Sequence, residues 1–349
     1  MDAELFTIAE LRSAARSARI EARVHAQIDS IEQKETSAQK PYFKLVFADA
    51  EGKFSLNAWS DSPAFAQCET LARGAFVEVA GDFAHNGSFG IESKRWSCRP
   101  LDDGERDALL GGSGALRERQ QADFAFIVQT ADALADPRLH ALCGIFLADF
   151  GERFRRTAAA RDYHHARRGG LVEHTAQMMR GALAISGVYP QLNADLLVAG
   201  ILFHDCGKLW ENALPETGFT MGYDERGELL GHIAIGVELV NSLWRKLQAG
   251  DAFDAWKTLD PASEDVRFHL LHLILSHHGE KQFGSPIEPK TPEAQALHYI
   301  DNLDAKMEMF AGGYAKAAQL APRIFERVRP LPGNLVLPLG KFTARPGEA

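Results

Sequence analysis

The chain changes its hydrophobic period near residue 120. Between residues 20 and 98, apolar and polar positions alternate with the period of two that is typical of half-buried strands. In the first such segment, Ala22, Val24, Ala26 and Ile28 fall on one side. Beyond residue 120, apolar residues recur at the spacing of one helix face. This pattern predicts a β-rich region followed by an all-helical region.

The first region is expected to contain five strands and one short helix. We place the strands at residues 20–31, 42–47, 53–59, 75–83 and 89–98, with a helix after the third, at residues 61–71. In the third strand, Phe54, Leu56 and Ala58 are expected to face a core, while Lys53 and Trp59 face out. Residues 85–88 should form a hairpin turn between the last two strands. This order of elements predicts an OB-fold barrel.

The second region predicts a helical bundle. Its helices are expected at residues 121–134, 137–157, 170–186, 192–206, 229–248, 264–278 and 291–320. A length of 349 residues favours two domains. We therefore divide the chain into an N-terminal arm (1–17), the barrel (18–100), a linker (101–122), the helical domain (123–322) and an irregular tail (323–349).

Composition narrows the class of protein. The chain has 38 basic and 47 acidic residues and a net charge of −9, which excludes nucleic-acid binding through overall positive charge. The four cysteines form no CxxC pair, which favours a reduced, cytoplasmic protein. No segment has the length of apolar sequence expected of a signal peptide or a membrane span, so no membrane partner is expected.

Histidine is concentrated in the helical region. Of the 13 histidines, only His25 and His85 precede residue 140. An apolar helix at residues 195–203 ends in His204-Asp205, where burial of both side chains is costly unless something pairs with them. A divalent cation held by both would offset that cost. The same character recurs at His174, at His232, at His277-His278, and at the carboxylates of Asp301 and Asp304.

These clusters predict a metal site in the helical region. Imidazole and carboxylate ligands without thiolates suit manganese, iron, cobalt or magnesium better than structural zinc. The order H…HD…H…HH…D on consecutive helices is much harder to attribute to chance than any single histidine.

The series resembles the HD metal-dependent phosphohydrolase superfamily, whose fold is an all-helical bundle. It is also similar to the YhaM-type 3′-to-5′ exoribonucleases, which have an OB-fold before the HD domain. That similarity covers roughly residues 18–320 and rests on these segments: His164-His165 with Gly169-Gly170 and His174, His204-Asp205 with Lys208, Gly231-His232, Ser276 to Gly279, Gly284-Ser285-Pro286, and Ile300 to Lys306.

The resemblance implies a ligand set. His174, His204, Asp205 and Asp301 would hold one divalent ion, with Mn²⁺ favoured and Co²⁺, Fe²⁺ or Mg²⁺ as alternatives. A second ion would be bridged by Asp205 and completed by His232 and by one or both of His277 and His278. Asp304 would support the ligands or pack the helix. Asp205, Lys208 and His165 are the expected catalytic residues, with Lys208 contacting a phosphate or, alternatively, being an exposed cation at a helix end.

The general acid stays open at this point. His165, or whichever of His277 and His278 is not a ligand, would protonate the leaving group. His174 also needs an acceptor for its second nitrogen, and Glu173 and Asp304 are candidates.

Substrate binding is assigned to two groups of residues. A run of arginines before His174 includes Arg161, Arg167 and Arg168, which are expected to bind phosphates rather than to form a solvated helix face. On the barrel, the exposed Trp59 would stack a base, with Lys44 and Lys53 beside the backbone, unless Trp59 only covers a barrel end.

These features predict a metal-dependent 3′-5′ exoribonuclease that acts on single-stranded RNA or DNA, with a homo-oligomer left open. One alternative is a phosphohydrolase of a small nucleotide, although the Gly-Tyr-Pro signature of cyclic di-GMP enzymes is absent after Gly279. A non-catalytic nucleic-acid-binding module is the other.

Overall fold

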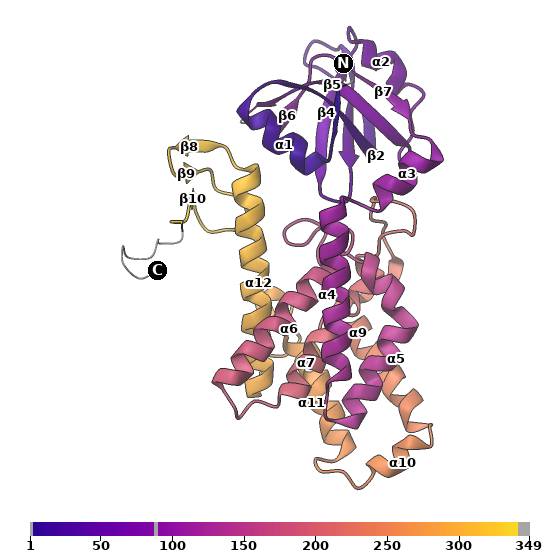
Figure 1. Ribbon diagram of the computed structural model, residues 1–349, viewed down its shortest axis with the longest axis vertical. Coiled ribbons are helices and arrows are strands. Elements are labelled where there is room, and N and C mark those ends of the chain that lie inside the picture. The colour runs from indigo at the N-terminus through magenta and orange to yellow at the C-terminus, as the bar shows by residue number, and fades with distance from the viewer. Residues whose placement is uncertain (1–2, 87–89, 341–349) are drawn as a thin grey trace, which may run out of the picture.

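The computed structural model describes residues 3–86 and 90–340, which form a β-rich lobe and a helical lobe. Figure 1 shows the β-rich lobe at one end of the long axis, with the helices stacked below it. The predicted order, a β region followed by a helical region, is confirmed.

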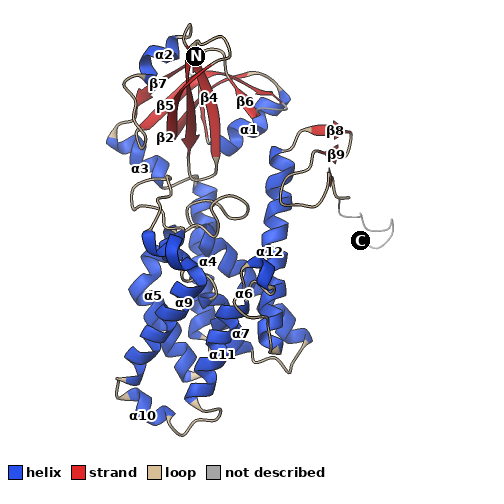
Figure 2. Ribbon diagram, turned by 180° about the vertical axis from the view of Figure 1, so that it is seen from behind, coloured by secondary structure: helices blue, strands red, loops and turns tan. Residues whose placement is uncertain are grey.

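One seven-stranded sheet builds the first lobe. Its strands are β1 (Glu4–Phe6), β2 (Ile20–Glu35), β3 (Pro41–Ala48), β4 (Lys53–Trp59), β5 (Phe76–Asn86), β6 (Gly90–Glu92) and β7 (Trp96–Pro100). The strands run in the order β4-β3-β2-β5-β6, with β7 on β5 and helix α2 (Pro63–Cys68) inserted after β4 (Figure 2). Strand β2 thus pairs with both β3 and β5, and this topology is that of an OB-fold barrel.

Alternation along the strands fills the barrel core. Phe54, Leu56 and Ala58 of β4 are buried, whereas Lys53 and Trp59 at its two ends are exposed. Because side chains alternate between the two faces of a strand, the predicted inward positions all reach the same core.

The strand expected at residues 89–98 is instead two short strands. Strand β6 pairs with the end of β5, and β7 pairs with its middle. Between them, the Ser93 hydroxyl lies within hydrogen-bond distance of the Arg95 carbonyl (3.0 Å) and of the Asp82 carboxylate (3.3 Å), and residues 93–95 are outside the ladder. Asn86 and Gly90 pair across the expected hairpin, but the turn itself, at residues 87–88, lies outside the described residues.

Residues 3–17 contact the barrel closely. Helix α1 (Ile8–Ser17) follows β1, which pairs with β2 in parallel. Thr7 caps the helix, and the Asp49 carboxylate accepts a hydrogen bond of 2.7 Å from the Ile8 N–H. Ile8 and Leu11 are fully buried in the barrel core. This arm therefore adds an apolar helix face to the β-rich lobe.

The helical lobe matches the predicted helices and adds short ones. Helix α3 (Asp103–Leu110) lies against the barrel, and the helical lobe contains α4 (Gly114–Asp132), α5 (Pro137–Arg156), α6 (Gly170–Val188), α7 (Ala194–Phe203), α8 (Lys208–Glu211), α9 (Glu225–Gln248), α10 (Ala252–Trp256), α11 (Ser263–Ser276) and α12 (Pro292–Lys316), with a 3-10 turn η1 (Lys281–Phe283). Helices α3 and the start of α4 occupy the segment that we expected to be a linker. After α12, the short strands β8 (Gln319–Ala321), β9 (Ile324–Phe325) and β10 (Leu335–Val336) form a small sheet that projects beside the barrel (Figure 1).

Helix α7 is the centre of the helical lobe. Every residue from Leu196 to Phe203 is buried, as expected for a helix that is apolar on all sides. Gly200 lies where a Cβ atom would overlap Leu273 of α11 and come within 3.2 Å of Leu297 of α12. This close approach positions the end of α7, where His204 and Asp205 follow.

The two lobes contact each other through hydrogen bonds and through an apolar cluster that contains Ala50, Leu116 and Phe219. Gln27 of β2 accepts hydrogen bonds from the backbone N–H groups of Phe219 (2.6 Å) and Thr220 (3.2 Å). Arg16 of α1 donates to the carbonyl oxygens of Tyr314 and Ala315 at the end of α12.

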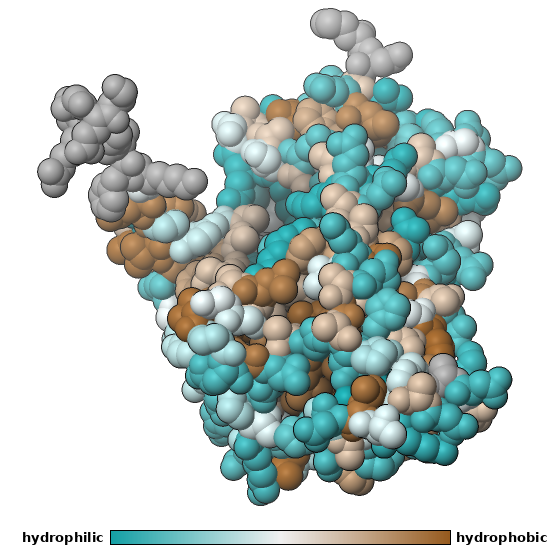
Figure 3. Space-filling view, turned by 60° about the horizontal axis from the view of Figure 1, so that its bottom comes forward, coloured by the Kyte–Doolittle hydropathy of each residue, from teal (hydrophilic) through white to brown (hydrophobic). Residues whose placement is uncertain are grey.

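None of the helices in the described ranges combines the length and apolarity that crossing a bilayer requires. On the face in Figure 3, hydrophobic side chains are scattered among hydrophilic ones.

We predict that Gly200→Ala destabilises the protein by about 1–3 kcal/mol, because the added methyl group must displace Leu273 in a packed core. The matched control is Gly144→Ala on the exposed side of α5, where a Cβ atom meets nothing within 4 Å. Alanine there should stabilise the helix by about 0.5–1 kcal/mol. Urea unfolding followed by tryptophan fluorescence measures the stability change of each variant. Equal unfolding midpoints for the two variants would contradict the tight packing of α7.

Candidate metal centre

Five histidines converge below the end of α7, and each is oriented by a hydrogen bond at Nδ1. His174 Nδ1 is 2.7 Å from Asp304 Oδ2, and His232 Nδ1 is 2.7 Å from Glu211 Oε2. The other three bond backbone carbonyl groups: His204 to Ile201 (2.7 Å), His277 to Ile274 (2.7 Å) and His278 to Phe283 (2.8 Å). A histidine whose Nδ1–H donates in this way presents its Nε2 lone pair, as metal-ligating imidazoles do.

The backbone conformation of nearby glycines helps to orient two of these histidines. Gly231 interrupts α9 with a φ of 70°, a left-handed conformation that glycine adopts without strain, and His232 follows directly. Gly169 has a φ of 77° and starts α6, four residues before the buried Glu173-His174 pair. Gly231 beside His232, and Gly169 at the start of the helix that contains His174, therefore have a conformational role.

The first cluster consists of His174, His204, Asp205 and Asp301. His174 Nε2 is 3.3 Å from His204 Nε2 and 3.4 Å from Asp301 Oδ1, and His204 Nε2 is 3.2 Å from Asp205 Oδ2. Ligand atoms that each lie about 2.1 Å from one ion are separated by roughly 3.0–3.4 Å in tetrahedral or octahedral geometry. The four side chains expected to share one ion are thus close enough to do so.

The second cluster lies on the other oxygen of Asp205. Asp205 Oδ1 is 3.6 Å from His232 Nε2 and 3.6 Å from His277 Nε2, and His278 lies in the same group of ligand atoms. Among the described residues, these three atoms of Asp205, His232 and His277 are buried without a hydrogen-bond partner. An unsatisfied buried polar atom costs about 1–3 kcal/mol. Three that converge on one point fit a divalent cation, with Asp205 shared between both clusters.

Electrostatics in the centre favours a charged Asp205. Burial alone would raise the pKa of this carboxyl group, but His204 and Lys208 outweigh burial and hold it well below its usual range. Burial, followed by the neighbouring His278, lowers the pKa of His277 well below its usual value. Anionic carboxylate and neutral imidazole are the forms that ligate metals.

Lys208 lies inside the centre. Its side chain is buried, and Nζ is 2.5 Å from Asp205 Oδ2. Burial and this ion pair argue against an exposed cation at a helix end. The ammonium group is positioned to contact an anion bound beside Asp205.

The adjacent histidines His164 and His165 differ in what they face. His165 Nε2 is 2.9 Å from Asp304 Oδ2, and its Nδ1 is 3.8 Å from Glu173 Oε2, so both nitrogens face carboxylates. Although burial lowers its pKa, these two carboxylates raise it overall. His165 therefore supports Asp304, the acceptor of His174, and does not face the ligand atoms.

His164 is the member of the pair that faces the centre. Its ring centroid is 5.8 Å from that of His174, and the charges that act on it include those of Lys208, Asp301 and Asp205, whereas His165 is bonded to Asp304. Burial, followed by the charge of Lys208, lowers its pKa to about 4. Sequence reasoning missed this residue, although the doublet was visible. It also missed Glu211, which orients His232 and which no motif in the sequence indicates.

The predicted arginines are not a solvated helix face. Arg167 forms ion pairs with Glu173 and with Glu308 (2.6 Å), which commits its guanidinium to the protein. Arg161 donates to the carbonyl groups of Glu211 (2.8 Å) and Gly222 (3.0 Å). Arg168 likewise bonds three carbonyl groups, those of Pro215 (2.7 Å), Glu216 (2.9 Å) and Gly218 (3.3 Å).

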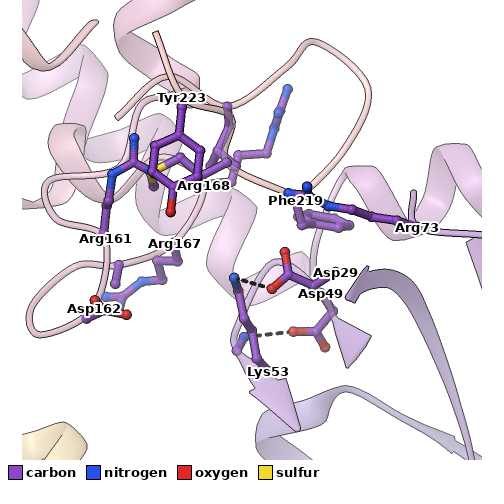
Figure 4. Close-up of a pocket in the computed structure, with 14 residues that line it drawn as sticks. Asp29, Asp49, Lys53, Arg73, Arg161, Asp162, Arg167, Arg168, Phe219 and Tyr223 are labelled. Atoms are coloured by element: carbon purple, nitrogen blue, oxygen red, sulfur yellow. Dashed lines mark hydrogen bonds and ion pairs between the residues drawn. The ribbon is translucent and has the colours of Figure 1, made fainter. Parts of the chain in front are cut away.

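The barrel residues expected to bind a strand divide between the two ends of β4, with Trp59 and Lys44 towards one end and Lys53 at the other. Trp59 is 44% exposed at one end of β4, beside Tyr42 at a ring distance of 4.8 Å, and Lys44 lies on the neighbouring strand opposite Asn57. Lys53 is at the other end of β4 and pairs with Asp29 at 2.8 Å. Lys53 and Trp59 are six residue steps apart along an extended strand, a distance of about 20 Å. Only Lys53 lies beside the helical lobe (Figure 4).

The fold and the site define a protein with an HD domain. The family model described as "HD domain" matches residues 171–306, a range that includes His174, His204, Asp205 and Asp301. These ligand atoms and the shared carboxylate form a centre suited to divalent metal.

Comparison of the whole chain shows the family. The chain is 31% identical over 323 residues to the 3′-5′ exoribonuclease YhaM of Geobacillus sp. (strain WCH70), covering 92% of this chain and 87% of that one. It is 32% identical over 294 residues to the YhaM of Bacillus subtilis (strain 168), covering 83% of each. The chain belongs to the YhaM family of 3′-5′ exoribonucleases.

A solved structure is similar to a smaller part of the chain. It is the OB domain of Ta0387 from Thermoplasma acidophilum, which is 12% identical with a TM-score of 0.21, covering 29% of this chain and 89% of that one. The assignment of the first lobe as an OB-fold barrel rests on the strand order of this chain.

We predict that Asp205→Asn removes most of the bound divalent metal, because one carboxylate oxygen belongs to each cluster. His232→Ala should lose only the ion of the second cluster, so the two variants differ in stoichiometry. Metal content after reconstitution with Mn²⁺ and desalting, read by mass spectrometry, measures both. Asp149→Asn, on the surface beside Lys246, is the matched control and should keep the metal of the wild type. An Asp205→Asn protein with undiminished metal would rule out the shared ligand.

Proposed function

We propose that this protein is a metal-dependent 3′-5′ exoribonuclease that hydrolyses the phosphodiester bonds of single-stranded RNA. The single observation that carries the proposal is the buried Asp205 carboxylate, with one oxygen among His174, His204 and Asp301 and the other facing His232 and His277 without a partner. It occurs in a chain that aligns over 92% of its length with a relative named as a 3′-5′ exoribonuclease.

The ligand set supplies the chemistry that phosphodiester hydrolysis needs. Divalent ions bound there lower the pKa of water and neutralise charge on the phosphoryl oxygens. His174, His204, Asp205 and Asp301 would hold one ion, and Asp205 with His232, His277 and His278 would hold another. Manganese is the ion we expect, because the donors are imidazole and carboxylate without thiolate.

Lys208 and His164 are the residues we assign to the substrate. The Lys208 ammonium group, beside Asp205, would contact a phosphoryl oxygen of the bond to be cleaved. We assign to His164 the proton-transfer role that the sequence assigned to His165, because His165 is bonded to Asp304 whereas His164 lies within the field of Lys208, Asp205 and Asp301. Although burial and Lys208 lower its pKa, the negative charge of a bound phosphodiester opposes both effects.

The remaining expectations follow from the same proposal. Single-stranded DNA is a second possible substrate, and the 2′-hydroxyl groups of RNA would provide the discrimination. The four cysteines are free thiols, in keeping with the reduced cytoplasmic location expected from the sequence. A homo-oligomer and a cytoplasmic location stay predictions.

The test of the proposed function is the direction of cleavage. A 3′-labelled oligoribonucleotide should release labelled mononucleotide from the first time point, whereas the 5′-labelled form should shorten as a ladder. EDTA should stop both reactions and Mn²⁺ should restore them, because in this proposal the divalent ions activate the attacking water. The same sequence as DNA, run in parallel, measures the preference. Early internal fragments from both labels would show an endonuclease and contradict the proposal.

We predict that His164→Ala lowers kcat on RNA by about 10²–10⁴-fold, as loss of a general acid does. The loss should be much smaller on bis(p-nitrophenyl) phosphate, because nitrophenolate leaves without protonation. His165→Ala is the matched control in the adjacent position, and its effect should be the same on both substrates, since it acts through Asp304. Equal losses on both substrates for His164→Ala would remove the proton-transfer role.

A further inference from the structure

A cleft between the two lobes consists of two adjoining cavities. The larger, about 490 Å³, is lined by α1 and the end of α12, and the smaller, about 220 Å³, by the loop that contains Phe219 and Tyr223. Figure 4 shows the smaller cavity, with barrel residues on one wall and residues of the helical lobe on the other. The two cavities share these lining residues: Gly52, Lys53, Arg161, Asp162, Ala166 and Arg167.

The cleft carries fixed positive charge. Arg161 and Arg168 are held by backbone carbonyl groups, and within residues 3–86 and 90–340 neither guanidinium has a carboxylate at ion-pair distance. A carbonyl group orients a guanidinium but does not neutralise its charge. Two acidic side chains in the smaller cavity already have partners within the protein. Asp29 forms an ion pair with Lys53, and the Asp49 carboxylate accepts hydrogen bonds from three backbone N–H groups. In a chain with net charge −9, this concentration favours an anionic ligand.

Two exposed tyrosines border the same cleft. Tyr223 is 77% exposed, and the Arg161 guanidinium lies 4.4 Å from its ring centroid. Tyr163 is 57% exposed and lines the larger cavity. Aromatic faces beside arginine side chains bind single-stranded nucleic acids, because bases stack on the rings while phosphates meet the charges.

One loop connects the cleft with the metal centre. Tyr163 precedes His164, whose ring lies beside that of His174. Arg161 bonds the carbonyl oxygen of Glu211, and the side chain of Glu211 orients His232. One loop, residues 157–169, therefore lines the cleft and also reaches the ligands.

We propose that this cleft binds the 3′-terminal nucleotides of single-stranded RNA, with bases on Tyr163 and Tyr223 and backbone phosphates beside Arg161 and Arg168. This inference rests on the proposed exoribonuclease function. It places the strand at the Lys53 end of the barrel, about 20 Å along β4 from Trp59.

The test compares the Michaelis constants of single variants on a 12-nucleotide oligoadenylate and on bis(p-nitrophenyl) phosphate. Tyr163→Ala and Tyr223→Ala should each raise KM for the oligonucleotide about 5- to 100-fold, the range for one lost base stack. Both should leave kinetics on the small ester unchanged. Tyr163→Phe and Tyr223→Phe keep the ring and should restore the KM of the wild type. Arg161→Gln should reduce the slope of log KM against log salt by about 0.7, for one phosphate contact.

The control is Tyr189→Ala, which removes a 50%-exposed tyrosine at the end of α6, outside the cleft. It should leave both substrates unaffected. Unchanged KM for both cleft tyrosine variants, or a rise only for Trp59→Ala, would overturn the cleft assignment. So would equal losses on RNA and on the small ester, because the tyrosines would then support the metal centre. A wild type that binds oligoadenylate in an anisotropy titration but releases no nucleotides would instead overturn the proposed function, and the same titration would still test the cleft.

Discussion

The buried carboxylate of Asp205 is the constraint on which the arrangement of the helical lobe depends. Its side chain is almost inaccessible, yet its two oxygens face two separate sets of imidazole nitrogens. An ionised carboxylate in that position is costly unless charge and ligand atoms surround it. The charge of Lys208 and the lone pairs of the histidines make the site suited to divalent ions, and the apolar α7 positions the carboxylate deep enough to exclude bulk water.

The support for these ligands comes from segments that are distant in the sequence. Asp304 of α12 orients His174 of α6, and Glu211 at the end of α8 orients His232 of α9. His165 adds a further hydrogen bond to Asp304. His174 and His232 are therefore held by partners on other elements, while His204 and His277 bond carbonyl groups of their own helices, and each bond fixes the tautomer as well as the position.

The loop at residues 212–224 connects this support to the barrel. Gln27 of β2 accepts hydrogen bonds from Phe219 and Thr220, while the same loop supplies the carbonyl groups that hold Arg168. Arg161 reaches the carbonyl of Glu211 at one end of the loop and that of Gly222 near the other. The barrel thus contacts the metal-bearing lobe through the segment that borders the cleft, so the position of the barrel and the shape of the cleft are set together.

The sequence by itself determined the fold class and most helices, because these follow from local periodicity, and polar residues inside apolar helices marked a metal site; the shared ligand set was implied by the resemblance to the HD superfamily. Alternation placed Phe54, Leu56 and Ala58 in the barrel core, and His204-Asp205 at the end of an apolar helix marked the centre. Only the tertiary structure decided which neighbour faces the ligands, His164 or His165. It alone placed Arg167 in ion pairs and Trp59 far from Lys53. The physical reason is that adjacent residues in a loop point in different directions, and the partner of a charged side chain is set by chain segments that pack together only after folding.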